Sequence, residues 1–195
     1  MGEDRLRRYR DKRDFARTAE PSGASRQRPG RRFVIQKHDA SSLHYDFRLE
    51  VGGVLRSWAV PKGLSTDPRD KRLAMPTEDH PMDYIDFEGV IPKGQYGGGP
   101  VIVWDNGTFE NTTTRKGTAI DLAQALDAGH ATVRLEGQKL TGGYAITRVA
   151  TGKDERWLVV KMKDEAADAR RNPVSTQPES VLSGRTVEDL IEADG

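Results

Sequence analysis

Between Arg32 and Lys163 the chain consists of short β-type runs separated by turn residues, and this pattern limits the fold more than any other feature. The runs are rich in β-branched and aromatic residues, and glycine, proline or asparagine divides them. The expected strands are RRFVIQ (31–36), LHYDFRLE (43–50), VLRSWAV (54–60), RLAMPTE (72–78), DYIDFEG (83–89), VIVWD (101–105), TFEN (108–111), ATVRLEG (131–137), KLTGGYAITRV (139–149) and RWLVVKM (156–162). We therefore predict a mainly β protein, a closed antiparallel barrel of about eight strands with one or two peripheral helices.

Two turn signals and one helical pattern refine this prediction. Gly52-Gly53 and Asn106-Gly107 are typical of tight hairpin turns, so each is expected to join two strands. A helix is expected from roughly Thr118 to Ala128, because its apolar residues fall on one face and a glycine follows it. These residues are Leu122, Ala125, Leu126 and Gly129.

Charge divides the chain into an arm, a body and a tail. Residues 1–37 hold 12 Lys and Arg against 5 Asp and Glu, whereas residues 38–195 hold 19 against 25. We expect a basic N-terminal arm over 1–30, a β-barrel domain over 31–163 and a polar tail over 164–195, in which 169–180 resembles a linker. A basic arm favours a polyanionic partner such as nucleic acid, although a merely solvated tail fits the charge equally well.

Composition excludes several classes of site. The chain has no cysteine, which excludes disulfides, thiolate metal sites and a cysteine nucleophile. No stretch approaches the ~20 apolar residues of a membrane span, and no signal peptide is visible. We expect a cytoplasmic, nucleoid-associated monomer without a membrane partner.

The run LHYDFRLE carries the clearest chemical signal. Its alternation places apolar side chains on one face and polar ones on the other. On the polar face His44 and Asp46 can share a metal ion while Arg48 reaches a bound anion. His38, just beyond the preceding strand, is the candidate for a third ligand, and such a set leaves positions open for a substrate. The alternative is an ordinary solvated strand face.

A second cluster lies in RLAMPTEDHPMDY. It contains Arg72, Glu78, His80 and Tyr84, which could bind phosphate and relay protons. A charged turn explains the same residues. Lys62 lies in a Pro-Lys-Gly turn and could contact phosphate, or simply be exposed. The glycine-rich run 95–99 lacks the Lys-Ser/Thr ending of a P-loop, so we interpret it as a flexible loop.

Four segments together resemble the 3′-phosphoesterase domain of bacterial ATP-dependent DNA ligase D, including its stand-alone relatives. They are FVIQKHDASSLHYDFRLE (33–50), SWAVPKG (57–63), KRLAMPTEDHPMDY (71–84) and DFEGVIPKGQYGGG (86–99). The resemblance extends from about residue 13 to 163, and PESVLSGRTVEDL (178–190) is similar to the segment that follows this domain in larger ligases.

This resemblance implies a manganese-dependent barrel enzyme, in which another divalent transition metal could take the same place. The activity implied is end-healing in DNA repair: removal of a 3′-terminal ribonucleoside and then of the 3′-phosphate, which leaves a 3′-OH for ligation. The implied partners are nucleic acid 3′ ends, such as a primer-template with a terminal ribonucleotide or 3′-phosphate, and a separate DNA ligase.

The resemblance also assigns roles by position. It makes His38, His44 and Asp46 the metal ligands and places Arg48, His80 and Tyr84 around the phosphate. Supporting residues are Gln36, Lys62, Arg72 and Glu78. His80 is the candidate general acid or phosphate donor. In the arm, Arg13, Asp14 and Glu20 match a functional segment, which we expect to fold over the barrel mouth with Phe15 as its apolar anchor.

Two other functions fit the same residues. A non-catalytic module that binds nucleic acid ends would use the basic arm and keep the metal as a structural element. A non-haem iron oxygenase could use two histidines and one carboxylate as a facial triad.

Overall fold

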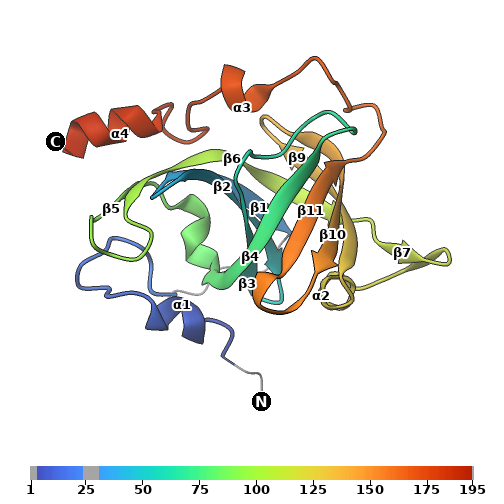
Figure 1. Cartoon of the computed structure of the whole chain (residues 1–195), viewed down its shortest axis with the longest axis horizontal. Coiled ribbons are helices and arrows are strands. Elements are labelled where there is room, and N and C mark those ends of the chain that lie inside the picture. The colour runs from blue at the N-terminus through green and yellow to red at the C-terminus, as the bar shows by residue number, and fades with distance from the viewer. Residues whose placement is uncertain (1–3, 24–30, 195) are drawn as a thin grey trace.

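A closed antiparallel barrel forms the body of the protein. The structure, a computed structural model, describes residues 4–23 and 31–194. In that part of the chain, eight strands follow one another in the order β1, β2, β3, β4, β11, β10, β9 and β6, and β6 pairs back onto β1 (Figure 1). Their bounds are β1 Arg32–Asp39, β2 Leu43–Val51, β3 Val54–Val60, β4 Lys71–Pro81, β6 Gly99–Asn111, β9 His130–Gly137, β10 Thr141–Ala150 and β11 Arg156–Lys161. The predicted fold class is confirmed.

Smaller elements decorate the barrel. β5 (Gly89–Ile91) extends the sheet beside β6, and β7 (Thr114–Arg115) pairs with β8 (Thr118–Ala119) as a short ribbon. Helix α2 (Leu122–Asp127) confirms the expected helix and its buried face. It begins later than predicted because the Asp121 side chain accepts a hydrogen bond from the Gln124 backbone N–H (3.3 Å) and caps the first turn.

One of the two predicted hairpin turns is wrong. Gly52 and Gly53, with φ of 60° and 84°, form the tight turn between β2 and β3 as expected. Asn106 and Gly107 instead lie inside β6, where they pair with Val34 and Phe33 of β1. The glycine serves a close approach there, because a Cβ atom on Gly107 would lie 2.0 Å from the Glu136 carbonyl oxygen on β9.

The run DYIDFEG is not a strand. Residues Met82–Asp86 form the short 3-10 helix η1, directly after Pro81 at the end of β4, and only Gly89–Ile91 is extended. Tyr84 and Ile85 are adjacent and both buried, an arrangement that a strand with one covered face cannot provide. Packing against the barrel therefore decided this segment against its β propensity.

Two apolar cores lie on opposite sides of the β1–β2–β3 wall. The inner core fills the barrel and contains Ile35, Phe47 and Trp58 among many other side chains. The outer core lies against the outside of the wall and combines Val34 and Leu55 with residues of η1 and with Tyr9 of the arm. Both faces of these strands are therefore covered.

Both terminal segments pack on the barrel. In the arm, helix α1 (Arg7–Asp11) buries Tyr9. Beyond β11 the chain forms α3 (Pro173–Thr176) and α4 (Val187–Asp194). The Trp104 ring N–H donates to the Gln177 carbonyl (2.7 Å) and the Val181 N–H to that of Val103 (2.9 Å), so the expected linker over 169–180 is a packed segment.

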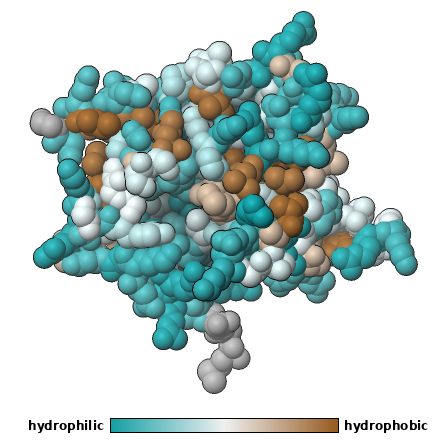
Figure 2. All heavy atoms as spheres, in the orientation of Figure 1, coloured by the Kyte–Doolittle hydropathy of each residue, from teal (hydrophilic) through white to brown (hydrophobic). Residues whose placement is uncertain are grey.

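The face of the molecule seen in Figure 2 is mainly hydrophilic. Figure 2 shows apolar patches over α4 and over the outer side of β4 and β11, where Leu73, Met75 and the adjacent Met162 are exposed. Among the described helices, none has the length and apolar content needed to cross a membrane.

Candidate metal and phosphate site

The candidate site lies on the outer face of the barrel wall. Antiparallel pairing of β1 with β2 sets His38 opposite His44 and Gln36 opposite Asp46. Because strand side chains alternate, these four residues and Arg48 share the face turned away from the barrel interior. The sequence had suggested that His38 lies just beyond this strand, but the structure places it within β1.

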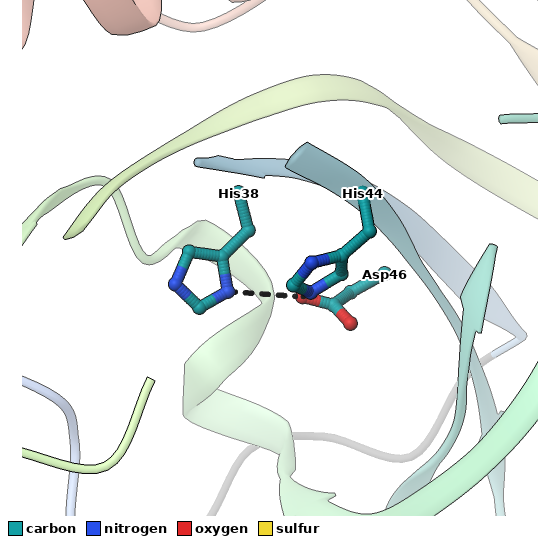
Figure 3. Close-up of side chains that lie close together, drawn as sticks. All are labelled: His38, His44 and Asp46. Carbon is teal, nitrogen blue, oxygen red and sulfur yellow. Dashed lines mark hydrogen bonds and ion pairs between the residues drawn. The ribbon is translucent and has the colours of Figure 1, made fainter. Parts of the chain in front are cut away.

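Three candidate ligands converge on one point (Figure 3). The Asp46 Oδ2 atom lies 3.5 Å from His38 Nδ1 and 3.2 Å from His44 Nε2. One ligand atom from each residue lies within 4.8 Å of the others. Within the described residues, these three side chains form the group that could hold a metal ion. The grouping agrees with the predicted triad.

The nitrogen not facing Asp46 is occupied in both histidines. His38 Nε2 donates to the Gly97 carbonyl (2.6 Å), and His44 Nδ1 donates to the Ser42 carbonyl (3.1 Å). Backbone carbonyls of this kind orient a ligating histidine, and the other nitrogen, which hydrogen-bonds to Asp46 when it is protonated, can bind a metal ion once it has lost its proton. The three side chains therefore fit a divalent transition metal held by two imidazoles and one carboxylate.

Charge around Asp46 keeps it ionised. Burial alone would raise its pKa, but Arg48 and hydrogen bonds from the two histidines outweigh burial and hold the pKa of Asp46 well below its usual range. Burial lowers the pKa of His44, but the Asp46 carboxylate raises it by more, so the pKa of His44 is raised overall. A carboxylate that is fully ionised near neutral pH is ready to bind a cation.

Two acceptors, Gln36 and Asp46, hold the Arg48 guanidinium group, and His80 lies beside it. Its Nε donates to Gln36 Oε1 (2.7 Å), and its two terminal nitrogens lie 3.2 Å from His80 Nδ1 and 3.4 Å from Asp46 Oδ2. Gln36 is itself fixed, since its amide donates to the backbone carbonyls of Tyr84 and Phe87. The cation is therefore rigidly placed beside the candidate ligands.

His80 is buried between two arginines. Its Nδ1 donates to the Glu78 carbonyl (2.8 Å), which leaves Nε2 to accept from Arg13 (3.3 Å). Burial, followed by the charges of Arg48 and Arg13, holds the pKa of His80 well below its usual value. The neutral ring thus orients Arg13.

The arm closes one side of the site. Arg13 donates to Glu20 Oε2 (2.8 Å) and to Glu78 Oε1 (3.2 Å), and its side chain is only 5% exposed. The Tyr84 hydroxyl donates to Glu20 (2.9 Å), and burial raises the pKa of Tyr84 well above its usual value. Arg13 and Glu20 thus lie against the outer wall of the barrel and not over its mouth.

A pocket of about 430 Å³ gathers most of the predicted site residues. It is lined by Arg13, His38, His44, Asp46, Arg48, Glu78, His80 and Tyr84, together with Tyr96 and neighbouring small residues. Gln36 and Glu20 lie behind this lining, in contact with Arg48 and with Arg13 and Tyr84.

Three predicted residues lie elsewhere. Asp14 is exposed, accepts from the Ala16 N–H (3.1 Å) and pairs with Arg17, within the turn that follows Arg13. Lys62 and Arg72 line a separate hollow of about 320 Å³ between the end of β3 and the start of β4. The structure thus does not bring these three to the metal ligands.

The structure adds three residues that the sequence did not single out. Tyr9 packs its ring 4.9 Å from His80, and Lys12 donates to Glu78 (2.9 Å). Tyr96 stands at the pocket rim. The sequence signal that could have pointed to Tyr9 was an aromatic residue among the charged residues of the arm.

A barrel whose outer wall carries two histidines and one carboxylate beside buried arginines has the side chains of a candidate metal-binding protein with positive charge next to the metal site. Comparison with known proteins narrows this class. Residues 36–148 match the family described as the DNA ligase D 3′-phosphoesterase domain, so the chain belongs to that family.

Two relatives illustrate the match. The chain is 47% identical, over 93% of its length, to the multifunctional non-homologous end joining protein LigD of Pseudomonas aeruginosa. It is 43% identical, over 83% of its length, to the multifunctional non-homologous end joining DNA repair protein LigD of Mycobacterium tuberculosis. The chain covers 22% and 20% of these two relatives, about a fifth of each.

Proposed function

We propose that this chain is a manganese-dependent 3′-phosphoesterase that prepares nucleic acid ends for ligation in non-homologous end joining. The observation that supports this most directly is the position of Arg48, which lies 3.4 Å from Asp46 and beside His38 and His44 in one pocket. Family membership supports the reaction class. The grouping of three possible metal ligands next to Arg48 supports a cation and a phosphate bound side by side.

The reaction proposed has two hydrolytic steps. In the first, water forms a bond to phosphorus and the bond to the 5′ oxygen of a terminal ribonucleoside breaks, which leaves a 3′-phosphate. In the second, water releases inorganic phosphate and leaves a 3′-OH. Each departing oxygen needs a proton or an equivalent hydrogen bond.

The charged side chains stabilise the phosphate during both steps. A bound divalent ion would neutralise phosphate oxygens as a Lewis acid. Arg48, whose guanidinium is fixed by Gln36, presents a planar set of N–H donors that suits two phosphate oxygens. Because it is already oriented, little reorganisation is needed as charge develops.

His80 suits a positioning role better than that of a general acid. Its ring is neutral, and Nε2 accepts from Arg13. We propose that His80 keeps Arg13 oriented beside the phosphate, because its Nε2 accepts from the Arg13 guanidinium.

A labelled primer-template ending in one ribonucleotide tests the proposal. With manganese, the primer should lose its terminal nucleoside to give a 3′-phosphate and then a 3′-OH; with chelator it should stay intact. Binding without any turnover would instead indicate an end-binding module, and strict dependence on iron and oxygen would indicate an oxygenase.

A further inference from the structure

Tyr96 is an aromatic side chain left in an unusual position. In the described part of the chain it is the one aromatic residue that is largely exposed, at 48%. It also lines the pocket that contains the candidate metal ligands. Exposing a large ring at a pocket rim leaves apolar surface in water, and such a ring is available to a ligand.

The ring is fixed relative to the metal ligands. Tyr96 occupies a turn in which the Gly98 N–H donates to the Gln95 carbonyl (3.0 Å). The next residue, Gly97, has φ of 72° and accepts a 2.6 Å hydrogen bond from His38 on its carbonyl. A residue with a Cβ would be strained at Gly97 and would lie 3.2 Å from the His38 ring. The turn therefore holds Tyr96 at a set distance from the ligand triad.

Positive charge surrounds the ring. Lys12 Nζ lies 4.7 Å from its centroid and donates to its hydroxyl (3.3 Å). The Arg13 guanidinium carbon lies 5.4 Å from the same centroid. An aromatic face beside cations is the arrangement with which proteins hold single-stranded nucleic acid, since the ring stacks on a base while the cations attract phosphate.

We propose that Tyr96 is the stacking platform for the nucleobase of the 3′-terminal nucleotide, and so a specificity-determining residue that favours ends carrying a base. The inference rests on the proposed function, because it assumes a 3′ phosphoester at the triad. Every base has a π-face, so the platform should accept all four bases with small differences.

The test measures binding separately from turnover. An oligonucleotide ending in 2-aminopurine, whose fluorescence falls on stacking, is titrated with the protein in chelator, where no hydrolysis is expected. Its partner probe ends in an abasic sugar and carries a remote fluorophore for anisotropy. The variants are Tyr96→Leu, which removes the ring, and the matched control Tyr96→Phe, which removes only the bond to Lys12.

The expected result is a loss confined to the base. Tyr96→Leu should abolish quenching and weaken binding of the base-bearing end about tenfold, in the range for one lost base–aromatic stack, and should bind the abasic end within about twofold of wild type. Tyr96→Phe should retain quenching. Thermal melting confirms that both variants are folded.

Three results would overturn the proposal. They are the absence of quenching in the wild-type protein, equally weakened binding of both probes in Tyr96→Leu, and a Tyr96→Phe variant as impaired as Tyr96→Leu. The last result would mean that the hydroxyl acts by holding Lys12 and that the ring does not stack on a base. Failure of the proposed function would look different, since quenching would persist in a protein that hydrolyses no primer in manganese.

Discussion

At the scale of single residues, the site depends on side chains that are fixed before any ligand binds. Asp46, Arg48 and His80 are each at most 5% exposed, and each makes at least one hydrogen bond within the protein. Fixed groups of this kind stabilise developing charge without further ordering. They also make each residue intolerant of apparently conservative change.

Arg48→Lys should lose most of the activity although the charge is kept. Lysine has one nitrogen where arginine contacts Gln36, His80 and Asp46 with three, and it cannot hold two phosphate oxygens in one plane. We expect kcat/KM to fall more than tenfold, or more than ~1.4 kcal/mol of transition-state stabilisation. Steady-state assays on the ribonucleotide-ended primer measure it. Performance within about twofold of wild type would show that planar contact is not the role.

Asp46→Asn should bind manganese weakly and remain folded. The amide keeps the size of the carboxylate and an oxygen for His44, but removes the negative charge that the cation requires. Calorimetric titration with manganese and circular dichroism measure the two properties. Metal affinity equal to that of wild type would remove Asp46 from the ligand set, whereas loss of folding would show a structural role for the carboxylate beside Arg48.

At the scale of elements, the arm contributes contacts and not merely charge. Arg13 joins Glu20 of the arm to Glu78 of β4, and Tyr9 lies in the outer core. Removing the arm would leave Glu78 without its two cationic partners, Lys12 and Arg13. Breaking buried pairs in this way is strongly unfavourable.

Deleting residues 1–20 should therefore lower kcat as well as affinity. If docking of the arm completes the site, neither saturating substrate nor a scrambled arm of equal charge should restore the rate. Counterion release alone would give a salt-dependent loss of affinity that the scrambled arm repairs. Rates at saturating substrate, measured at two salt concentrations, distinguish docking from counterion release. Full rate with the scrambled arm would show that the arm acts only through its charge.

Asp14 tests the same element more finely. Its carboxylate caps the turn between Arg13 and Glu20 by accepting from the Ala16 N–H. If it acts by holding this turn, Asp14→Asn, which keeps an acceptor oxygen, should retain most of the rate that Asp14→Ala loses. Equal loss in both variants would mean that the negative charge itself is required.

At the scale of the whole molecule, the C-terminal segment is attached to the barrel through a buried lysine. Lys139 donates to the carbonyls of Gln177 and Glu179 and lies over the Trp104 ring. Burial lowers the pKa of Lys139 from 10.5 to about 8. The folded state thus disfavours the charged form relative to the unfolded chain.

This shift makes a pH prediction with a definite sign. Below about pH 8 the lysine is charged in both states, and burying its charged ammonium group destabilises the folded protein by the full amount. Between about pH 8 and 10.5 the folded form binds fewer protons than the unfolded chain, so this destabilisation declines as pH rises. Relative to Lys139→Met, the wild-type free energy of unfolding should therefore increase from pH 7 to pH 9.5. Urea denaturation of both proteins at the two pH values checks this; a constant difference would contradict it.

The alternation of Leu43 to Glu50 and the turn residues between strands were enough to predict a β-barrel, and the same alternation placed His44, Asp46 and Arg48 on one face. These are local properties, because strand geometry fixes which side chains share a side. Sequence alone could not say that this polar face would be buried, since that depends on η1 and the arm covering it from outside.

Tertiary structure decided the rest. The register of β1 with β2 put His38 opposite His44, a pairing between residues of different strands that no local pattern encodes. Contacts across the fold also turned DYIDFEG into a 3-10 helix, kept Asn106-Gly107 extended and packed the polar C-terminal segment against Trp104. Local propensities are worth about 1 kcal/mol or less per residue, so burial against a neighbouring element readily overrides them.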